Sequence, residues 1–371
     1  MKTNLIYILG MMCLSGTVSA QTTVNYTEFE QKVLDYSQTL KQSVSQRTAM
    51  QKAMKAAKTA FFPAVNATGS YQYRINKYDM DFGGMAVPME HDSYSAEVGV
   101  VQPIYAGGSI YHTYKASQIQ SQIADKSVDL TTDNLIYAAE ASYWGTAAQK
   151  EMYKTMCQYV EIISQLTKVL QDKYDDGYIS KTDLIQMQTR LKEAELQRSS
   201  SYQSYQIALQ NMNVLMGLEP DKEVGLVDSI FVELPLPAYV GADAALNVRP
   251  DYAISQLDVD YQKRQVKLAA AKYNPSLSIG FKETWGTQML NISGETMFNS
   301  NVYASVKLPL FHWGARFKST AAQKAILLGK QYALQDKQDQ ITKEVAKAWT
   351  SLTENTRQID IAKENCKLAE E

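Results

Sequence analysis

One order of elements occurs twice along this chain of 371 residues, and the duplication limits the folds that the chain can adopt. In each half, a helical segment stops at a proline, two alternating segments follow, and a long helical stretch comes next. Pro103 and Gly108 recur as Pro309 and Gly314, each 206 residues later. Self-similarity at a fixed offset is typical of repeat architectures. The sequence therefore predicts two copies of a unit built from a helix, a β-hairpin and a long helix.

Apolar and polar side chains alternate in four segments, at residues 65–75, 94–100, 276–281 and 301–308. A period of two indicates strands with one apolar and one polar face. We interpret the polar face as the lining of a water-filled lumen, with candidate residues Asn66, Thr68, Gln72, Arg74 and Glu97. The connecting loops, residues 78–92 and 286–299, are expected to face the exterior.

Helices are predicted at Tyr26–Ala60, 110–174, Lys181–Met216 and Asp251–Lys272, and after the second hairpin. Apolar residues in Lys181–Met216 recur every three and four positions, which is typical of a coiled-coil seam. The stretch 110–174 would be about 95 Å long at 1.5 Å per residue, longer than a globular core. Gly177 suits a helix end, and Ser180 or Thr182 can cap the next helix. The two long helices are expected to form an antiparallel hairpin with its tip at 175–183.

The first residues resemble a secretory signal peptide. Lys2 precedes the apolar stretch 5–14, and Val18–Ala20 is a small-residue cleavage pattern, so residues 1–20 are predicted to be removed. The apolar stretch is too short to span a membrane as a helix.

Composition argues against catalysis. The three histidines stand at no metal-binding spacing, and the sequence contains no nucleophile elbow, phosphate loop or zinc motif. We therefore predict no catalytic residue, metal or cofactor, and no enzyme. A net charge of −2 gives no indication of a nucleic-acid partner.

Four strands per chain imply an assembly. Closing a barrel takes about eight strands, and an open sheet leaves edges that a bilayer does not tolerate. Three copies would supply a 12-stranded barrel, within the size range of outer-membrane barrels. The pattern thus predicts a homotrimer whose apolar strand faces contact outer-membrane lipid.

Three motifs carry a resemblance to a known family. They are "NVRPDYAISQLDVDYQKRQVKLAAAKYNPSLSI", the pair "QPIYAGG" and "LPLFHWG", and the segment from "DGYISKTDL" to "NVLMG". In order and duplicated, they make the chain resemble the TolC-like outer-membrane efflux proteins, the exit ducts of tripartite efflux pumps and type I secretion systems. The resemblance covers nearly all of the chain after the signal peptide.

The resemblance implies a trimeric outer-membrane β-barrel continued by a periplasmic α-helical tunnel. It implies that a periplasmic adaptor (membrane fusion) protein docks at the tip, and that an inner-membrane transporter acts indirectly. The tip positions are Gly177, Tyr178, Ile179, Ser180, Thr182 and Asp183. For Asp183 the alternative is a charge that complements the helix dipole.

The Arg249-Pro250-Asp251 motif is interpreted as structural. Pro250 suits the first helical position, Asp251 suits the first turn, and Pro275 stops the same helix before the second hairpin.

The expected organisation is a signal peptide (1–20), a first repeat (21–217), a linker (218–241) and a second repeat (242–371). The second repeat is expected to stop before its helical tip, because the counterpart of Gly177 would fall at position 383. The fold class is mixed α and β in a membrane protein. The predicted function is a passive exit duct for small molecules or proteins. The alternative is a non-transporting periplasmic coiled-coil scaffold or a non-functional truncated fragment.

Overall fold

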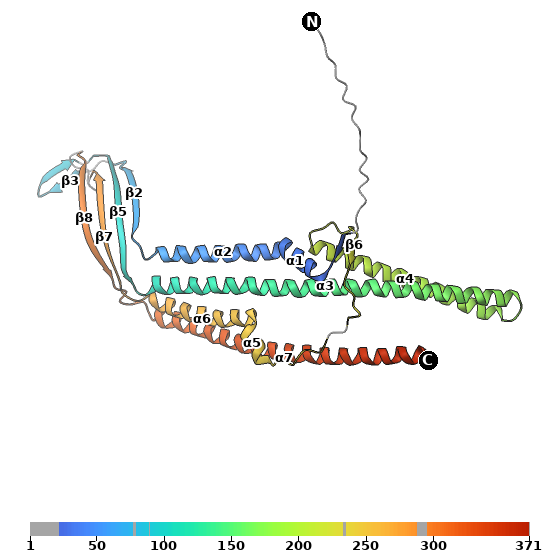
Figure 1. Ribbon diagram of the computed structural model, residues 1–371. Helices are drawn as coiled ribbons and strands as arrows, with labels where there is room; N and C mark the ends of the chain where they lie inside the picture. Colours follow the sequence, from blue (N-terminus) through green and yellow to red (C-terminus); the bar gives the residue numbers. More distant parts are fainter. Residues whose placement is uncertain (1–21, 77–78, 89, 233–234, 288–294, 371) are drawn as a thin grey trace, which may run out of the picture. The chain divides into compact units, whose positions relative to one another are not determined.

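The computed structural model describes residues 22–76, 79–88, 90–232, 235–287 and 295–370 (Figure 1). The predicted signal peptide lies outside these residues. The elements in chain order are β1 (Thr22–Val24), α1 (Tyr26–Tyr36), α2 (Gln38–Thr59), β2 (Ala64–Tyr73), β3 (Asp79–Phe82), β4 (Met85–Pro88), β5 (Asp92–Ala106), α3 (Ser109–Asp175), α4 (Lys181–Leu215), β6 (Val224–Leu226), α5 (Ala242–Val248), α6 (Pro250–Ala271), β7 (Ser276–Gly286), β8 (Met297–Lys307) and α7 (Ala315–Glu370).

The chain divides into two compact units. The first comprises Met1–Gln38 and Thr132–Leu234, and the second comprises Thr39–Thr131 and Pro235–Glu371. Helix α3 contributes to both, and its 67 residues make it about 100 Å long at 1.5 Å per residue. The predicted helix over 110–174 is therefore confirmed.

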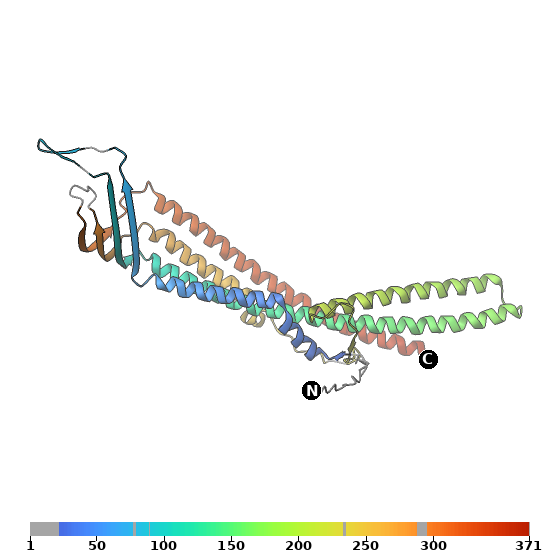
Figure 2. The same cartoon turned by 90° about the horizontal axis from the view of Figure 1, so that it is seen from above.

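The second unit holds the main sheet, whose order is β2-β5-β7-β8 with every pair antiparallel. Each predicted hairpin is present, and the β5–β7 pair joins the two halves. The register pairs Ala106 with Ser276 and Ser276 with Lys307. The helix-proximal strand ends therefore meet at one end of the sheet, and Figures 1 and 2 show α2, α6 and α7 running from that end.

Polar contacts join neighbouring helices of the second unit. Between α2 and α3, the Gln51 amide donates to Asp125 at 3.3 Å. Between α6 and α7, the buried Gln262 amide donates to the Gln323 side chain at 2.8 Å, and Lys330 pairs with Asp258 at 2.9 Å. These contacts hold the helices in the order of the strands to which they connect.

The seam predicted for Lys181–Met216 is confirmed by burial in α4. Its positions Leu184, Ala194 and Met212 are buried, and most of the intervening residues are exposed. Arg198 is the seam position that is exposed. A long charged side chain gains more from water than from the seam, which explains why the polar member stays outside.

The predicted helix Tyr26–Ala60 is broken at Ser37. This residue has φ −48° and ψ 115°, and its N–H still closes the last turn of α1 by donating to Val33 O at 2.9 Å. The break separates α1, which packs in the first unit, from α2, which belongs mainly to the second. A uniform helical pattern could not show this change of packing partner.

The first strand is shorter than predicted. β2 ends at Tyr73, so Arg74 is not a strand residue; its N–H donates to His91 O at 2.6 Å where the chain leaves the sheet. The predicted loop 78–92 contains a second hairpin, β3 paired with β4, whose turn uses the left-handed Gly83 and Gly84. Residues 78 and 89 of that loop, and 288–294 of the other, lie outside the described residues.

The predicted linker 218–241 contains β6, which pairs in parallel with β1 across about 200 residues of sequence. A further helix, α5, precedes the Arg249 motif. The prediction of four strands per chain holds for the main sheet, but the described residues contain eight strands. Strands of three or four residues are too short to show a period, so the sequence did not reveal them.

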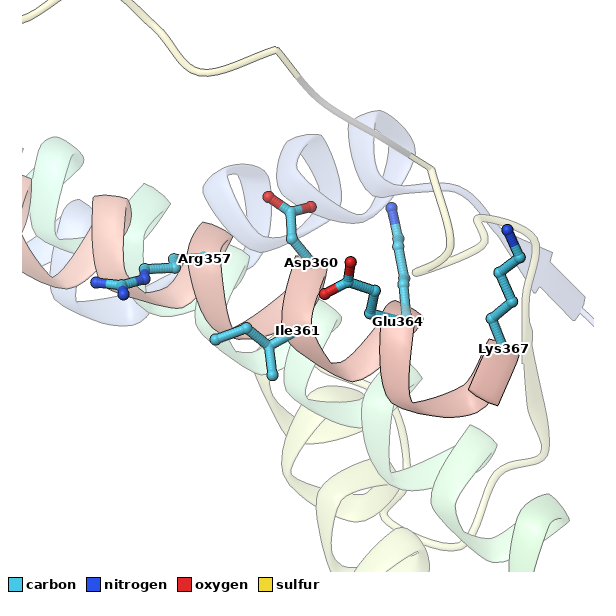
Figure 3. A pocket seen from close by; sticks show the side chains of 6 residues that line it. Arg357, Asp360, Ile361, Glu364 and Lys367 are labelled. Atoms are coloured by element: carbon cyan, nitrogen blue, oxygen red, sulfur yellow. The ribbon is translucent and has the colours of Figure 1, made fainter. Parts of the chain in front are cut away.

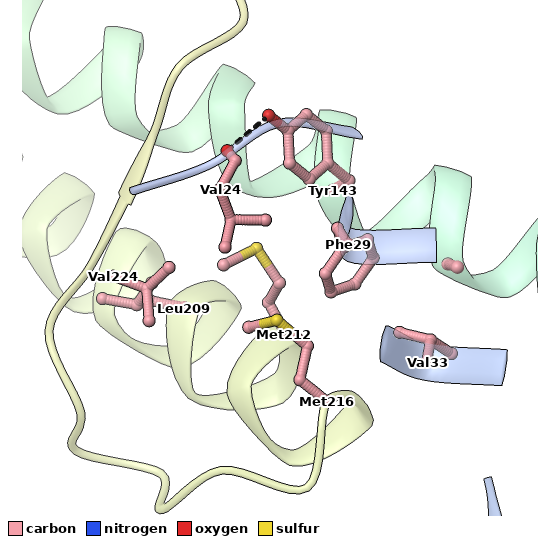
Figure 4. Packing of buried hydrophobic residues seen from close by; sticks show 9 residues of the cluster. Val24, Phe29, Val33, Tyr143, Leu209, Met212, Met216 and Val224 are labelled. Atoms are coloured by element: carbon pink, nitrogen blue, oxygen red, sulfur yellow. Dashed lines mark hydrogen bonds between the residues drawn. The ribbon is translucent and has the colours of Figure 1, made fainter. Parts of the chain in front are cut away.

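The buried core of the first unit gathers α1, α3, α4, β1 and β6 (Figure 4). Phe29 and Val33 of α1 meet Met212 of α4 and Tyr143 of α3, and all four are nearly or fully buried. The Tyr143 hydroxyl shares its one proton between Val24 O at 3.1 Å, the contact drawn in Figure 4, and the Asp228 carboxylate at 2.7 Å. This cluster fixes the base of the α3–α4 hairpin.

Candidate functional site

The main sheet has a polar face built from all four strands. The cross-strand row Thr68, Glu97 and Thr284 lies on one face, and the neighbouring row contains Asn66, Gly99 and Lys282. Glu97 accepts hydrogen bonds from the Lys282 ammonium at 3.1 Å and from the Thr284 hydroxyl at 3.3 Å. The face is thus a connected polar surface, and it also carries Gln72 opposite Ser93.

The other face is mainly apolar. One cross-strand row is Val65, Val100, Phe281 and Val302, all from different strands. Another holds Trp285, whose ring lies 5.6 Å from that of Tyr94. A sheet with one apolar and one polar face suits a boundary between lipid and water. Four of the five lumen candidates share the polar face, and Arg74 lies beyond the strand.

Sequence reasoning missed the charged part of β7. The predicted strand ends at Phe281, whereas β7 continues to Gly286 and adds Lys282 and Thr284 to the polar face. The signal was present, because polar residues continue at the even positions of β7. Glu283 departs from the pattern: it lies in the apolar-face row of Val98, where the Ser300 hydroxyl donates to it.

The tip between α3 and α4 is closed by its own backbone. Gly177 has φ +80°, its N–H donates to Tyr174 O at 2.9 Å, and the Tyr178 N–H donates to Lys173 O at 2.8 Å. These two bonds are the Schellman pattern, which satisfies the last carbonyls of a helix. The turn therefore needs no contact from outside the tip.

A capping box begins α4. The Asp183 N–H donates to Ser180 Oγ at 3.3 Å, and the Asp183 carboxylate accepts from Ser180 N at 3.2 Å and Ser180 Oγ at 2.7 Å. This geometry satisfies two helix N–H groups reciprocally. Thr182 is exposed, and Ser180 is the cap.

The tip presents an apolar side chain to its surroundings. Tyr178 is 80% exposed, and Ile179 beside it is half-buried. Nothing lies within 4 Å of where a Cβ on Gly177 would project. The tip thus combines a self-sufficient backbone with an aromatic ring available for contact.

The Arg249-Pro250-Asp251 motif joins α6 to α7. The Arg249 guanidinium donates twice to Asp251, at 3.0 and 2.9 Å, and once to Glu344 of α7 at 2.7 Å. Lys337 of α7 lies 3.7 Å from the same Asp251 carboxylate. Bidentate pairing fixes the guanidinium plane, so the motif holds the start of α6 against one side of α7.

These charges set the ionisation of Asp251. Burial raises the pKa of Asp251, but the hydrogen bonds and charge of Arg249, with the charge of Lys337, outweigh it and hold that pKa below its ordinary value. Hydrogen bonding to Asp251 raises the pKa of Arg249. Pro275 follows the end of α6, where Asn274 donates its amide to Gly107 O at 2.9 Å.

A shallow groove on α7 is lined by one helix alone. Figure 3 shows Arg357, Asp360, Ile361, Glu364 and Lys367 along successive turns of that helix. Because a single exposed helix supplies the lining, the groove does not enclose a ligand. Across the described residues, no three His, Cys, Asp or Glu side chains gather in a metal-binding arrangement.

No helix in the described part of the chain is both long enough and apolar enough to cross a membrane.

Comparison with known families decides the classification. Residues 30–218 and 241–371 match the family described as "Outer membrane efflux protein". The chain belongs to this family. The two matched stretches cover most of both predicted repeats and leave out most of the predicted linker, and the family resemblance seen in the sequence motifs is confirmed.

Individual relatives are distant. The chain is 21% identical over 278 residues to the alkaline protease secretion protein AprF of Pseudomonas aeruginosa, which covers 73% of this chain. It spans 57% of the length of that relative.

Solved structures share the fold. CusC superposes with a TM-score of 0.77 at 14% identity, covering 92% of this chain and 79% of that chain. VceC of Vibrio cholerae gives the same TM-score and identity, covering 91% of this chain and 81% of that chain.

Family membership settles location and chemical class. The protein is an outer-membrane component with a periplasmic helical part. The family consists of efflux channels and not of enzymes.

Proposed function

We propose that three copies of this chain form a passive exit duct across the outer membrane. The observation that carries the proposal is the main sheet, with its one polar and one apolar face and with β2 and β8 at its edges. Edge strands present unpaired backbone groups, which lipid cannot satisfy. Pairing β2 of one copy with β8 of the next would close 12 strands into a barrel.

The polar face then lines the lumen. Asn66, Thr68, Gln72 and Glu97 would contact water and substrate, with Lys282 neutralising Glu97 in place. The helices that follow the strands would continue the lumen as a periplasmic tunnel. The organisation into repeats at 21–217 and 242–371, joined by 218–241, supports this arrangement, because each repeat supplies one hairpin and its helices.

The tip is proposed as the docking point for a periplasmic adaptor protein coupled to an inner-membrane transporter. Tyr178 supplies an exposed ring, and the turn of Gly177 and the Ser180–Asp183 box hold it in place. AprF is by name an alkaline protease secretion protein, and this favours secretion or efflux as the process.

Conductance in planar bilayers tests the duct. The full chain, purified in detergent, is expected to have a trimeric mass by light scattering and to give discrete, ohmic conductance steps. A double variant, Glu97→Gln with Lys282→Gln, removes both charges of this ion pair and leaves the net charge unchanged. It should still give conductance steps, but with a changed ion selectivity. A monomer that inserts without conducting would contradict the duct and favour a scaffold.

A further inference from the structure

A basic groove lies between α3 and α6 in the second unit. Helix α3 lines it with the face that begins at Lys115 and includes Gln118 and Gln122, and α6 lines it with the face that begins at Asp260. On both helices the lining positions are spaced 0, 3, 4 and 7 along the chain, so each set lies on one helical face. The groove is therefore formed by two facing rows of side chains.

The two rows stand at a similar distance from the sheet. The Asn274 amide donates to Gly107 O at 2.9 Å, and a Cβ on Gly107 would come within 2.6 Å of Ala271 O. The start of α3 and the end of α6 thus abut at the strand ends. At 1.5 Å per residue, Lys115 lies about 9 Å along α3, and Lys267 about 6 Å before the end of α6.

The groove carries an excess of positive charge. Its lining contains four cations, Lys115, Lys263, Arg264 and Lys267, and a single carboxylate, that of Asp260. Asp260 pairs with Lys263 at 2.8 Å, and Lys115 donates to the Gln118 amide oxygen at 3.0 Å. Arg264 and Lys267 form no ion pair with any carboxylate of the described residues.

The pKa of His112 reflects the positive charge of this groove. Burial lowers the pKa of His112, and the charges of Arg264 and Lys267 lower it further. Cations gathered without matching carboxylates repel one another, and an anion relieves that repulsion. Arg264 and the two lysines at 263 and 267 lie within one turn of α6, close enough to share one ligand.

We infer that this groove binds a phosphate-bearing anion. A guanidinium and ammonium groups match phosphate oxygens in charge and hydrogen bonding, and the amides of Gln118 and Gln122 add neutral donors. The anion can come from two sources, a phospholipid headgroup or a soluble phosphate compound.

The lipid source rests on the proposed function. Strands of 11 residues such as β7, tilted by about 45°, span roughly 26 Å, close to the apolar band of an outer-membrane barrel. The four cations of the groove lie about 6–12 Å from the helix ends that abut the strands, by the same rise per residue, and would then lie at the depth of the phosphate headgroups. A soluble phosphate needs no membrane and would bind the same side chains.

Native mass spectrometry of the full chain in detergent tests the inference without requiring a bilayer. Delipidated protein is titrated separately with phosphatidylglycerol, phosphatidylcholine and inorganic pyrophosphate. The test variant is Arg264→Gln with Lys267→Gln, and a second is Lys115→Gln with Lys263→Gln. The matched control, Lys343→Gln with Lys347→Gln, removes two exposed charges from α7. The same spectra report whether the protein is a trimer.

Each cation near an anionic lipid contributes about fivefold in affinity, so either test variant should bind phosphatidylglycerol about 25-fold more weakly than wild type. The control should bind as wild type does. Binding of phosphatidylglycerol without pyrophosphate identifies a lipid headgroup, and equal loss of pyrophosphate binding in the test variants identifies a soluble anion. If the test variants bind phosphatidylglycerol and pyrophosphate as wild type does, or wild type binds neither of these two anions, the inference is wrong. A monomer that still binds would contradict only the duct.

Discussion

The tip and the base of the α3–α4 hairpin each contain a helix end closed by a glycine, but different kinds of contact hold them. At the tip, Gly177 closes the end of α3; at the base, Gly217 closes the end of α4 with the same pair of backbone bonds, from Gly217 N to Val214 O and from Leu218 N to Asn213 O. A Cβ on Gly177 would meet open space, whereas one on Gly217 would lie 2.3 Å from the Tyr36 ring.

The difference extends to the neighbouring polar groups. At the tip, Ser180 and Asp183 satisfy each other over three residues. At the base, Asp228 accepts from the Tyr143 hydroxyl and from the Tyr26 N–H, both at 2.7 Å and separated by 85 and 202 residues of sequence. The base is therefore anchored by distant parts of the chain, while the tip is held by contacts among its own residues.

The largest expected difference in stability between the base and the tip comes from replacing Gly217 and Gly177. Gly217→Ala combines left-handed backbone strain with a clash against Tyr36 and should lower the free energy of unfolding by about 3 kcal/mol. Gly177→Ala, which carries the strain alone, should cost about 1 kcal/mol. Chemical denaturation followed by circular dichroism measures both. Equal costs would show that the packing of Tyr36 against Gly217 contributes nothing.

Removing the anchor at the base should have nearly as large an effect. Asp228→Ala removes the charged 2.7 Å acceptor of the buried Tyr143 hydroxyl, which keeps only the longer contact to Val24 O at 3.1 Å, and it leaves the Tyr26 N–H without its side-chain partner, so the cost should be about 3 kcal/mol. The control is Asp221→Ala, since Asp221 is exposed and, among the described residues, accepts a side-chain hydrogen bond only from Gln210 at 2.9 Å. The same denaturation assay should show less than about 0.5 kcal/mol for the control. A similar loss in both variants would refute the anchoring role of Asp228.

Alkaline pH should weaken the base selectively. Burial, together with the Glu30 carboxylate, raises the pKa of Tyr26 to about 12, and burial with the hydrogen bond to Asp228 raises the pKa of Tyr143. A raised pKa favours folding while the hydroxyl is protonated, so this stability is fully present below about pH 10 and is lost as pH rises above it.

Hydrogen exchange measured at increasing pH, corrected for the intrinsic rate, locates the loss. Protection should fall in α1 and the base of α4 before it falls at residues 181–190. Tyr143→Phe should flatten part of this dependence, and an unchanged profile in that variant would assign the effect elsewhere.

Changes at the tip should affect docking more than stability. Asp183→Ala removes the capping box and should cost about 1 kcal/mol. Tyr178→Ala removes an 80% exposed ring, and its effect on stability should be within about 0.5 kcal/mol. If the tip is the docking point, Tyr178→Ala nevertheless reduces export in cells while outer-membrane levels stay unchanged. Normal export in that variant would move docking away from Tyr178.

Periodicity explains which parts of the fold could be predicted. The strands of the main sheet and the long helices each span enough residues to show a period of two or a heptad pattern. The turn at Gly177 and the cap at Ser180 were also readable, because local chemistry decides them. The start of α6 at Pro250 could be predicted for the same reason.

The remaining features depend on partners that are distant in sequence. β1 and β6 are three residues each and pair across about 200 residues, so no local pattern marks them. The break at Ser37 reflects a change of packing partner between α1 and α2. The bond between Tyr143 and Asp228 could not be inferred either, because an aspartate in a predicted linker carries no local sign of a partner 85 residues away.

Disulfide trapping between sheet edges tests the central claim most directly. Within one chain, β2 and β8 are separated by β5 and β7, about 14 Å at the usual strand spacing, which is too far for a disulfide. Thr68→Cys on β2 is combined in turn with Met297→Cys, Asn299→Cys or Asn301→Cys on β8, with Cys157 and Cys366 replaced by serine. The duct predicts that one combination gives covalent dimers and trimers in outer-membrane fractions on oxidation. Monomers alone in all three combinations would contradict closure of the sheet between copies.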